Sequence, residues 1–387
     1  TAPEGGFYSA EDADSLIEHG RPEHAEGAFY VWTEREIDDV LGADAKLFKD
    51  VYGVMPNGNA PAGADPHGEL RGKNVLIRRR EAANAEEAEI LARCRERLFT
   101  VRNKRPRPHL DDKIITAWNG LMISAFARAA QVLDEPHYLR AAENAARCVR
   151  THLYDEHSKT LVRNYRQGRS AVEGFADDYA FVIQGLLDLC EASFDVEWLK
   201  FALELQETQD RLFLDEATGG YFSVTGSDPS VLLRMKEDND GAEPAASSIA
   251  ALNLLRLAQI RADDAMRRRA EKTIAAFAAT LTRVPSAMPQ MLVALDYSLG
   301  KPQQIVIAGE READRTQELL REVHRHFHPR KILLLADGAA GSAFLEEKLE
   351  ALRGMKQVDS NATAYVCQDF TCQAPVNEPA ELRKLLV

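Results

Sequence analysis

The chain has 387 residues, of which 45% are hydrophobic and 28% are charged, and its formal net charge is −13. This length and composition are ordinary for one large globular domain together with a smaller one. The negative charge repels phosphate backbones and anionic lipid head groups, and no run of Lys and Arg is long enough to form a basic face. Nucleic acid and membrane surfaces are therefore not expected as partners.

The chain contains no segment that would place it in a membrane, and its cysteines do not indicate an oxidising compartment. No stretch approaches the ~20 uninterrupted apolar residues that a membrane-spanning helix needs. The five cysteines are an odd number and are scattered along the chain, which favours a reducing compartment over a disulfide framework. We therefore expect a soluble cytoplasmic protein. Because the chain begins at Thr1 rather than Met, a targeting signal or a further domain upstream stays open.

The first residues have the pattern of a β-hairpin. Residues 5–14 and 27–32 carry alternating aromatic side chains, which predicts two paired arms, and the second arm ends at Trp32. The first arm also holds Glu11, Asp12 and Asp14. These carboxylates either belong to an acidic ligand-binding rim or form a calcium-like or simply solvated turn.

Three similar helical pairs follow. Residues 114–133 and 138–153 have helical apolar spacing and are separated by Asp-Glu-Pro at 134–136. The same arrangement recurs with helices over 179–194 and 198–214 on either side of a break at 195–197. It recurs again with helices over 247–260 and 266–281 on either side of a break at 262–264. The sequence therefore predicts repeated αα-hairpins.

The spacing of the hairpins favours a ring. Units of about 60 to 70 residues are longer than ordinary solenoid repeats, because a long loop joins each pair to the next. In a helical toroid the first helix of each pair lies inside and is apolar nearly all round, as Leu252 and Leu255 suggest, whereas Arg267 to Arg269 give the second helix a wet face. We predict a mainly α fold, a toroid over residues 1–300, with an open array of helical pairs as the alternative.

The pattern changes after Pro302. Residues 304–308 and 331–336 read as buried strands, residues 312–327 as an amphipathic helix, and residues 362–367 as a third strand. This predicts a small α/β module over residues 301–387 that contains a parallel βαβ unit. Neither of the first two strands is followed by a Gly-rich phosphate loop, so no dinucleotide site, and no cofactor, is expected.

The loops before the first helices of the three hairpins are acidic. Because the inner helices of a toroid all start at the same end, these loops should converge on one mouth beside Trp118 and Tyr179. Carboxylates beside aromatic rings are suited to acid–base chemistry on sugars. The candidate catalytic residues are Asp112, Asp178 and Asp240, and the candidate substrate-binding residues are Glu11, Asp12, Asp14, Trp32, His109, Asp111, Lys113, Trp118, Asn119, Asp177, Tyr179 and Glu237. Each carboxylate has the alternative role of a helix cap.

Metal and thiol chemistry is not expected. Cys367 and Cys372 do not form a Cys-x-x-Cys motif, and no second pair exists for zinc, so two reduced thiols are predicted. His324, His326 and His328 are better explained as imidazoles near a helix end than as metal ligands.

Long motifs resemble a known family. They read Gly-Gly-Phe-Tyr-Ser-Ala-Glu-Asp-Ala-Asp-Ser from Gly5, Glu-Gly-Ala-Phe-Tyr-Val-Trp-Thr from Glu26, His-Leu-Asp-Asp-Lys-Ile-Ile-Thr-Ala-Trp-Asn-Gly-Leu-Met-Ile from His109 and Ala-Thr-Ala-Tyr-Val-Cys from Ala362. They are similar to the thioredoxin-domain-containing proteins related to the spermatogenesis-associated protein. The resemblance implies an N-terminal thioredoxin-like domain followed by an (α/α)6 barrel of the six-hairpin glycosidase and N-acylglucosamine 2-epimerase type.

The resemblance also implies that part of the family's architecture is missing. We expect this chain to lack the thioredoxin-like domain and the opening hairpins of the barrel. In one loop, where relatives tend to read Asp-Gly-Ala-Glu-Pro-Ser-Gly-Asn-Ser, this chain has Asp-Gly-Ala-Glu-Pro-Ala-Ala-Ser-Ser from Asp240, without the amide that could bind a ligand. The family implies no assigned activity.

Three functional hypotheses follow. The first is a carbohydrate-active enzyme, a sugar hydrolase or isomerase, in which one carboxyl is kept protonated by burial and a second is ionised. Epimerisation is disfavoured because His109 is the only histidine at the expected mouth. The alternative is a non-catalytic binding platform that works with a thioredoxin-like domain absent from this chain. In the third, a ring without its first hairpins is inactive and exposes apolar helices.

Overall fold

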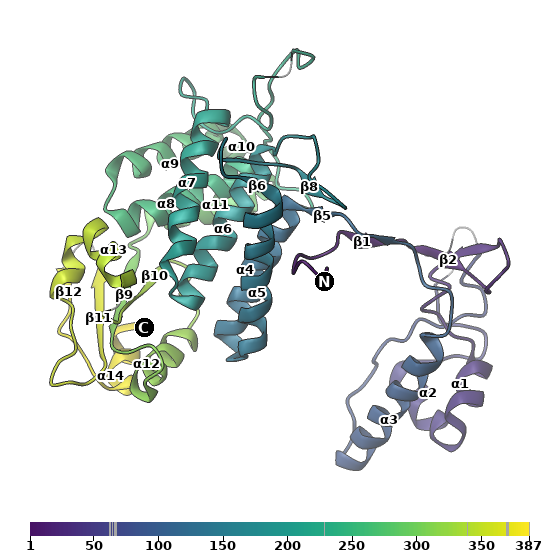
Figure 1. Cartoon of the computed structure of the whole chain (residues 1–387). Helices are drawn as coiled ribbons and strands as arrows, with labels where there is room; N and C mark the ends of the chain where they lie inside the picture. Colours follow the sequence, from purple (N-terminus) through teal and green to yellow (C-terminus); the bar gives the residue numbers. More distant parts are fainter. Residues whose placement is uncertain are drawn as a thin grey trace. The chain divides into compact units, whose positions relative to one another are not determined.

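The computed structural model describes residues 1–386 except 62, 64, 66, 67, 228, 339, 369 and 370. The chain divides into two compact units (Figure 1). Unit 1 comprises Thr1–Tyr8 and Lys113–Val387, and unit 2 comprises Ser9–Asp112. The helical hairpins and the C-terminal sheet both lie in unit 1, so the domain boundary expected between residues 300 and 301 stays a prediction.

Unit 2 is a small helical body with two short ladders. Its core is formed by Trp32, Phe48 and Leu91 together with other apolar side chains of the helices. Strand β1 pairs with β4 and strand β2 with β3, both antiparallel. Its elements are β1 (Ala10–Glu11), β2 (Asp14–Leu16), β3 (His24–Glu26), α1 (Glu34–Leu41), α2 (Ala45–Tyr52), α3 (Ala85–Arg102) and β4 (Leu110–Asp111).

The prediction that residues 5–14 pair with residues 27–32 in a β-hairpin is wrong, because other residues form the two strands. The observed hairpin pairs β2 with β3, and residues after Gly27 turn instead of extending. Gly27 has φ +67°, and its carbonyl oxygen accepts hydrogen bonds from the backbone N–H groups of Tyr30 (2.8 Å) and Val31 (3.1 Å). Glycine adopts this left-handed conformation without steric cost, so the strand ends there.

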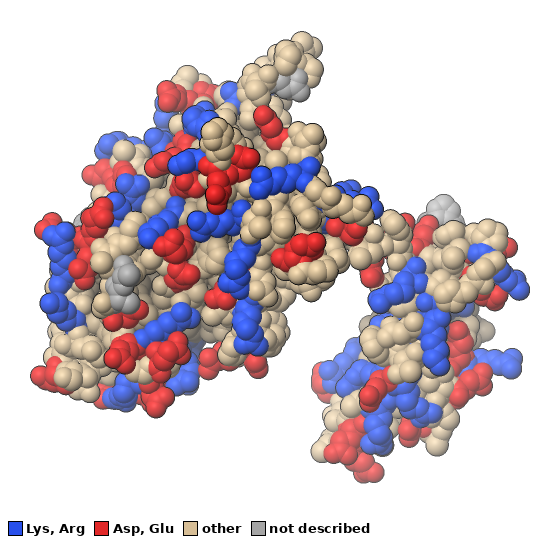
Figure 2. All heavy atoms as spheres, in the orientation of Figure 1, with Lys and Arg blue, Asp and Glu red and all other residues tan. Residues whose placement is uncertain are grey.

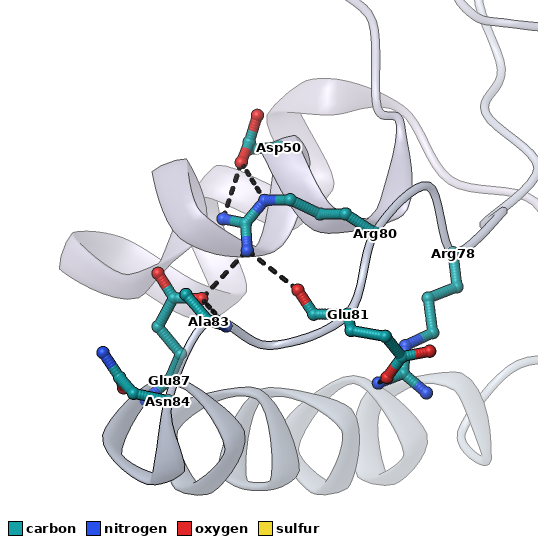
Figure 3. A network of polar contacts seen from close by, with 7 residues as sticks. All are labelled: Asp50, Arg78, Arg80, Glu81, Ala83, Asn84 and Glu87. Atoms are coloured by element: carbon teal, nitrogen blue, oxygen red, sulfur yellow. Dashed lines mark hydrogen bonds and ion pairs between the residues drawn. The ribbon is translucent and has the colours of Figure 1, made fainter.

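A polar network fixes the loop that leads into α3 (Figure 3). The Arg80 guanidinium donates to Asp50 of α2 at 2.8 Å and to Glu87 of α3 at 2.9 Å. Asn84 caps α3 by accepting from the Glu87 backbone N–H at 2.9 Å, while the Glu87 carboxylate accepts from the Ala83 backbone N–H at 2.8 Å. Arg80 therefore links two helices of unit 2 through one side chain.

Unit 1 is built from two layers of helices (Figure 1). In the inner layer α4 packs on α6, α6 on α8, and α8 on α11, while α5, α7 and α9 each pack on the helix that precedes them. The inner helices are α4 (Thr116–Leu133), α6 (Ala176–Ser193), α8 (Ala246–Arg261) and α11 (Pro289–Leu299). The outer ones are α5 (Pro136–Cys148), α7 (Val196–Phe213) and α9 (Asp264–Ala276), which α10 (Ala278–Arg283) follows.

This arrangement confirms the mainly α fold with the double helix layer of an α/α toroid. Nearly every residue of α6 and α8 is buried, whereas α9 buries only Met266, Ala270, Thr273 and Ile274. That contrast is what inner and outer helices require. The described residues contain three complete hairpins and one further inner helix.

The three hairpins turn in the same way. Each inner helix ends at a residue in the left-handed conformation, namely Asp134 (φ 54°), Phe194 (φ 56°) and Ala262 (φ 50°). The next residue is the N-cap of the outer helix, and Asp195 and Asp263 fill this role with side-chain hydrogen bonds. The breaks predicted at 134–136, 195–197 and 262–264 are therefore confirmed.

Close packing holds α4 against α6. A Cβ atom added to Gly120 would lie 2.4 Å from the backbone carbonyl carbon of Phe181, and one added to Gly185 would lie 2.5 Å from the backbone oxygen of Gly120. No real Cβ atom tolerates such distances, so both positions need glycine. The two inner helices therefore touch backbone to backbone.

Short ladders and a sheet complete unit 1. Between α5 and α6 lie β6 (Tyr154–Asp155), which pairs with β7 (Thr160–Leu161), and β8 (Asn164–Tyr165), which pairs with β5 (Ile114–Ile115). The C-terminal sheet has the order β10-β9-β11-β12. Its segment contains β9 (Gln303–Ala308), α12 (Asp314–His324), β10 (Lys331–Ala336), α13 (Ala340–Lys348), β11 (Thr363–Gln368), β12 (Thr371–Cys372) and α14 (Pro379–Leu386).

The sheet confirms the predicted parallel βαβ unit but contradicts the prediction that its two cysteines are reduced. Strands β9 and β10 are parallel, and the expected third strand is β11, antiparallel to β9. The prediction of two reduced thiols is wrong, because Cys367 and Cys372 form a disulfide. The pairing of β11 with β12 places the two residues directly opposite each other, with Cα atoms 3.9 Å apart.

The surface carries mixed charge. On the face drawn in Figure 2, Lys and Arg side chains are interspersed with Asp and Glu over both units. Within the described residues, no helix combines the length and the apolar character needed to cross a membrane.

Candidate functional site

The inner helices begin at one end of unit 1, and Asp178 joins two of them. Its carboxylate is fully buried and accepts hydrogen bonds from the backbone N–H of Ala117 in α4 and from that of Phe175, the N-cap of α6, both at 2.8 Å. The Arg163 guanidinium lies 3.0 Å away. Burial, then the charge of Asp177, raises the pKa of Asp178, and Arg163 opposes the shift.

Asp240 joins the next two inner helices. One carboxylate oxygen accepts from the backbone N–H of Ala245, the N-cap of α8, at 2.8 Å. The other accepts from the backbone N–H groups of Gln290 (2.8 Å) and Met291 (3.3 Å) in the first turn of α11. Asp178 and Asp240 thus both satisfy helix N-termini, the alternative role considered for them, and their catalytic role stays a prediction.

Other carboxylates at this end remain accessible. Asp177 is partly exposed and accepts from Arg163 at 2.7 Å, and the same guanidinium lies over the exposed ring of Phe175, 5.1 Å from its centroid. The half-exposed Trp118 donates its indole N–H to Glu243 at 2.7 Å. Contacts between α4, α6 and the loop before α8 therefore bring two of the three acidic loops, those before α6 and α8, to the start of α4.

Glu237 completes this group. It comes from the loop before α8. Its partial burial, followed by the charge of Asp177, raises its pKa; a hydrogen bond from the Ala246 backbone N–H lowers the pKa, and the charge of Glu243 raises it further. We call Asp177, Glu237, Glu243, Trp118 and Phe175 the acidic rim. It combines carboxylates in different electrostatic settings with two exposed aromatic faces.

Three further candidates of unit 1 have structural contacts. The Asn119 amide is buried and holds the N-terminal segment, accepting from the Phe7 backbone N–H at 2.8 Å and donating to the Phe7 and Ile115 carbonyls. Tyr179 is buried, and its hydroxyl accepts from the Leu161 backbone N–H at 2.8 Å. Lys113 is half-buried just before β5. Their expected part in binding stays a prediction.

The remaining candidates belong to unit 2. Glu11 accepts from the Tyr30 hydroxyl at 2.7 Å, and Asp12 accepts from the Asp14 backbone N–H at 3.2 Å. Trp32 is buried, with the Arg105 guanidinium 4.1 Å from its ring centroid.

The loop around β4 holds three more candidates. His109 is exposed, and its backbone carbonyl accepts from the Asp12 N–H at 2.8 Å, while Asp111 and Asp112 are half-buried. The expectation that all these unit 2 residues share a site with the inner helices stays a prediction.

Arg163, Phe175 and Glu243 were not among the candidates. Glu243 and Phe175 lie within acidic loops that the sequence does reveal, so a wider selection around those loops would have included them. Arg163 lies between β7 and β8, in a long connection without a recognisable motif. No sequence signal points to its ion pairs.

No family model matches the chain. Among curated proteins it is 42% identical over 411 residues to human spermatogenesis-associated protein 20, covering 99% of this chain and 52% of that protein. An uncharacterized protein of Caenorhabditis elegans is 37% identical over 409 residues, covering 99% of this chain and 55% of that protein. The chain thus spans about half the length of the curated relatives it matches.

Solved structures with a related fold are more distant. A cellobiose 2-epimerase of Bacillus thermoamylovorans has 12% identity and a TM-score of 0.39, covering 67% of this chain and 66% of that one. An alpha-1,6-mannanase of Salegentibacter has 11% identity and a TM-score of 0.37, covering 92% and 97%. These similarities are too weak to assign an activity. Homologues named spermatogenesis-associated protein 20 match the chain over 99% of its length, and the thioredoxin-like domain implied by the resemblance stays a prediction.

Proposed function

We propose that the protein is a carbohydrate-active enzyme, a sugar hydrolase or isomerase, that binds its substrate at the acidic rim. The observation that carries this proposal is the grouping of Glu237 with Asp177 and Glu243 beside the exposed rings of Trp118 and Phe175. Aromatic faces stack on the apolar faces of sugar rings, and carboxylates bind their hydroxyl groups.

The two carboxylates with contrasting surroundings supply acid and base. Glu237 has a raised pKa and suits the general acid, whereas Asp177 forms an ion pair with Arg163 and suits the general base. In hydrolysis Glu237 gives its proton to the leaving glycosidic oxygen as the bond from that oxygen to the anomeric carbon breaks. Asp177 takes a proton from the water whose oxygen bonds to the anomeric carbon. In isomerisation Asp177 takes the proton from C2 while Glu237 protonates the carbonyl oxygen on C1, and Asp177 then returns its proton to C1 while Glu237 takes back the proton of the C2 hydroxyl.

Asp178 and Asp240 act as positioning residues in this proposal. Each carboxylate holds the starts of two inner helices together, and the rim residues project from those starts and from the loops beside them. Their loss would disturb the rim through the fold and not through contact with the sugar.

A thermal-shift screen against mono- and disaccharides, sugar phosphates and aminosugars tests binding at the rim. We expect at least one sugar to raise the melting temperature of the wild-type chain, and the shift to vanish in Trp118→Ala. Val132→Ala is the matched control, because Val132 is a 70% exposed side chain near the other end of the same helix. If no sugar shifts the wild type, or if both variants respond alike, the proposal fails in favour of a non-catalytic platform.

A further inference from the structure

A second polar cavity lies far from the acidic rim. It has a volume of about 130 Å³, opens to the surface at α9, and is lined by residues of α8, α9, α11 and the start of the segment that leads to β9. Its polar lining comes from Gln259, Arg267, Glu271, Tyr297 and Ser298. Gln259 belongs to the last turn of α8, whereas the rim lies at the opposite, N-terminal end of the inner helices. The cavity is therefore a separate site in unit 1.

Tyr297 lines this cavity and carries an unused hydrogen-bond donor. The residue is only 3% exposed, and its hydroxyl oxygen is buried without a hydrogen-bond partner among the described residues. A buried hydroxyl without a partner costs on the order of 1–3 kcal/mol, so native structures rarely keep one without a ligand or a water molecule to satisfy it. The hydroxyl could therefore donate a hydrogen bond to a ligand that enters the cavity.

Two guanidinium groups lie near the Tyr297 hydroxyl. Arg267 lines the cavity and makes no ion pair with the described residues. Arg256 lies deeper, with Nη2 paired to Asp188 (2.8 Å) and Glu191 (2.7 Å), while its Nη1 is buried without a hydrogen-bond partner among the residues described.

Charged side chains near the Tyr297 hydroxyl shift its pKa in both directions. Burial raises the pKa of Tyr297, Arg256 lowers it, Glu191 raises it, and Arg267 lowers it. Both guanidinium groups are therefore close enough to act on the hydroxyl. With the Gln259 amide and the Ser298 hydroxyl, the wall presents several donors to an anion.

We infer that this cavity binds the carboxylate group of a small organic acid, held by the Tyr297 hydroxyl and the Arg267 guanidinium. The volume exceeds the ~10–15 Å³ that one water molecule needs and suits a molecule of a few heavy atoms. Charge-assisted bonds to Arg are the strong bonds available to a carboxylate. Glu271 on the same wall repels a second negative charge, which favours a monoanion over a phosphate dianion.

Isothermal titration of the full chain with acetate, propionate, inorganic phosphate and neutral acetamide tests the site. We expect acetate and propionate to bind and acetamide not to bind. Tyr297→Phe keeps the ring and removes one donor to a charged group, which should weaken carboxylate binding about tenfold or more. Arg267→Gln should weaken it at least as much.

The control is Arg268→Gln, which removes a neighbouring exposed charge on α9 that is not part of the cavity wall. Carboxylate binding should be unchanged in this variant. The inference is overturned if no carboxylate binds the wild type, or if Arg268→Gln weakens binding as much as Arg267→Gln. Phosphate binding that is tighter than acetate binding and depends on Tyr297 would overturn the assignment to a carboxylate. Because the rim variants leave this cavity intact, its test is independent of the proposed function.

Discussion

Replacing Asp178 by Asn should unfold unit 1 more readily than any other exchange of a carboxylate for an amide at this end. The native carboxylate accepts from two backbone N–H groups and faces a partly buried guanidinium. An amide has only one oxygen, so its NH2 group must face the backbone N–H of either Ala117 or Phe175. Two donors then face each other, and one hydrogen bond is lost. The ion pair with Arg163 is lost as well. Breaking a buried pair by removing one partner costs about 3–5 kcal/mol.

The matched variant is Asp177→Asn. Asp177 precedes Asp178 in the same helix turn and pairs with the same guanidinium. It is partly exposed, however, and among the described residues its side chain hydrogen-bonds to Arg163 alone. Its loss should cost about 1 kcal/mol or less. Urea unfolding monitored by circular dichroism measures both. Equal midpoints for the two variants would refute the view that Asp178 holds α4 and α6 together.

Two further perturbations test the packing of unit 1. Gly120→Ala would place a Cβ atom 2.4 Å from the backbone of Phe181 and should destabilise by about 1–3 kcal/mol or more, whereas Gly354→Ala, in open space, should be nearly neutral in the same urea titration. Burial lowers the pKa of His324 to about 4, so the unfolded chain, with a pKa near 6.5, binds more protons between these values. Stability should fall by up to about 3 kcal/mol as pH drops from 6.5 to 4, and His324→Leu should flatten that slope; an unchanged slope would contradict the assignment.

The helical repeat could be predicted from the sequence because apolar spacing and helix-breaking residues are local features of the chain. Apolar spacing marks the helices, and the break at residues 134–136 carries Pro136, which occupies the first turn of α5. The parallel strands β9 and β10 were equally clear, since fully buried strands read as continuous apolar runs. Glycine at 27 shows the limit of such patterns. Alternating aromatics predicted a strand where a left-handed turn forms.

The site depended on contacts between distant segments. Asp178 looked like a catalytic acid or a cap of its own helix, but its second partner, Ala117, lies 61 positions earlier in the chain. The pairing of Cys367 with Cys372 follows from strand register, which a spacing of five does not reveal. The ion pair between Arg163 and Asp177 could not be predicted, because it forms only when the fold brings the start of α6 next to Arg163. The sequence thus located the acidic loops, whereas the contacts that their carboxylates make follow only from the fold.

The measurement that tests the central claim most directly is product formation by Glu237→Gln on a sugar that binds the wild type. The variant keeps the size and polarity of the side chain but cannot deliver a proton, and loss of a general acid typically slows turnover by 10²–10⁴. Glu312→Gln, at a 90% exposed position of the same unit, is the control. We predict that Glu237→Gln retains sugar binding and loses at least about a hundredfold in kcat, while Glu312→Gln is unaffected. Turnover by Glu237→Gln at the wild-type rate would contradict the account.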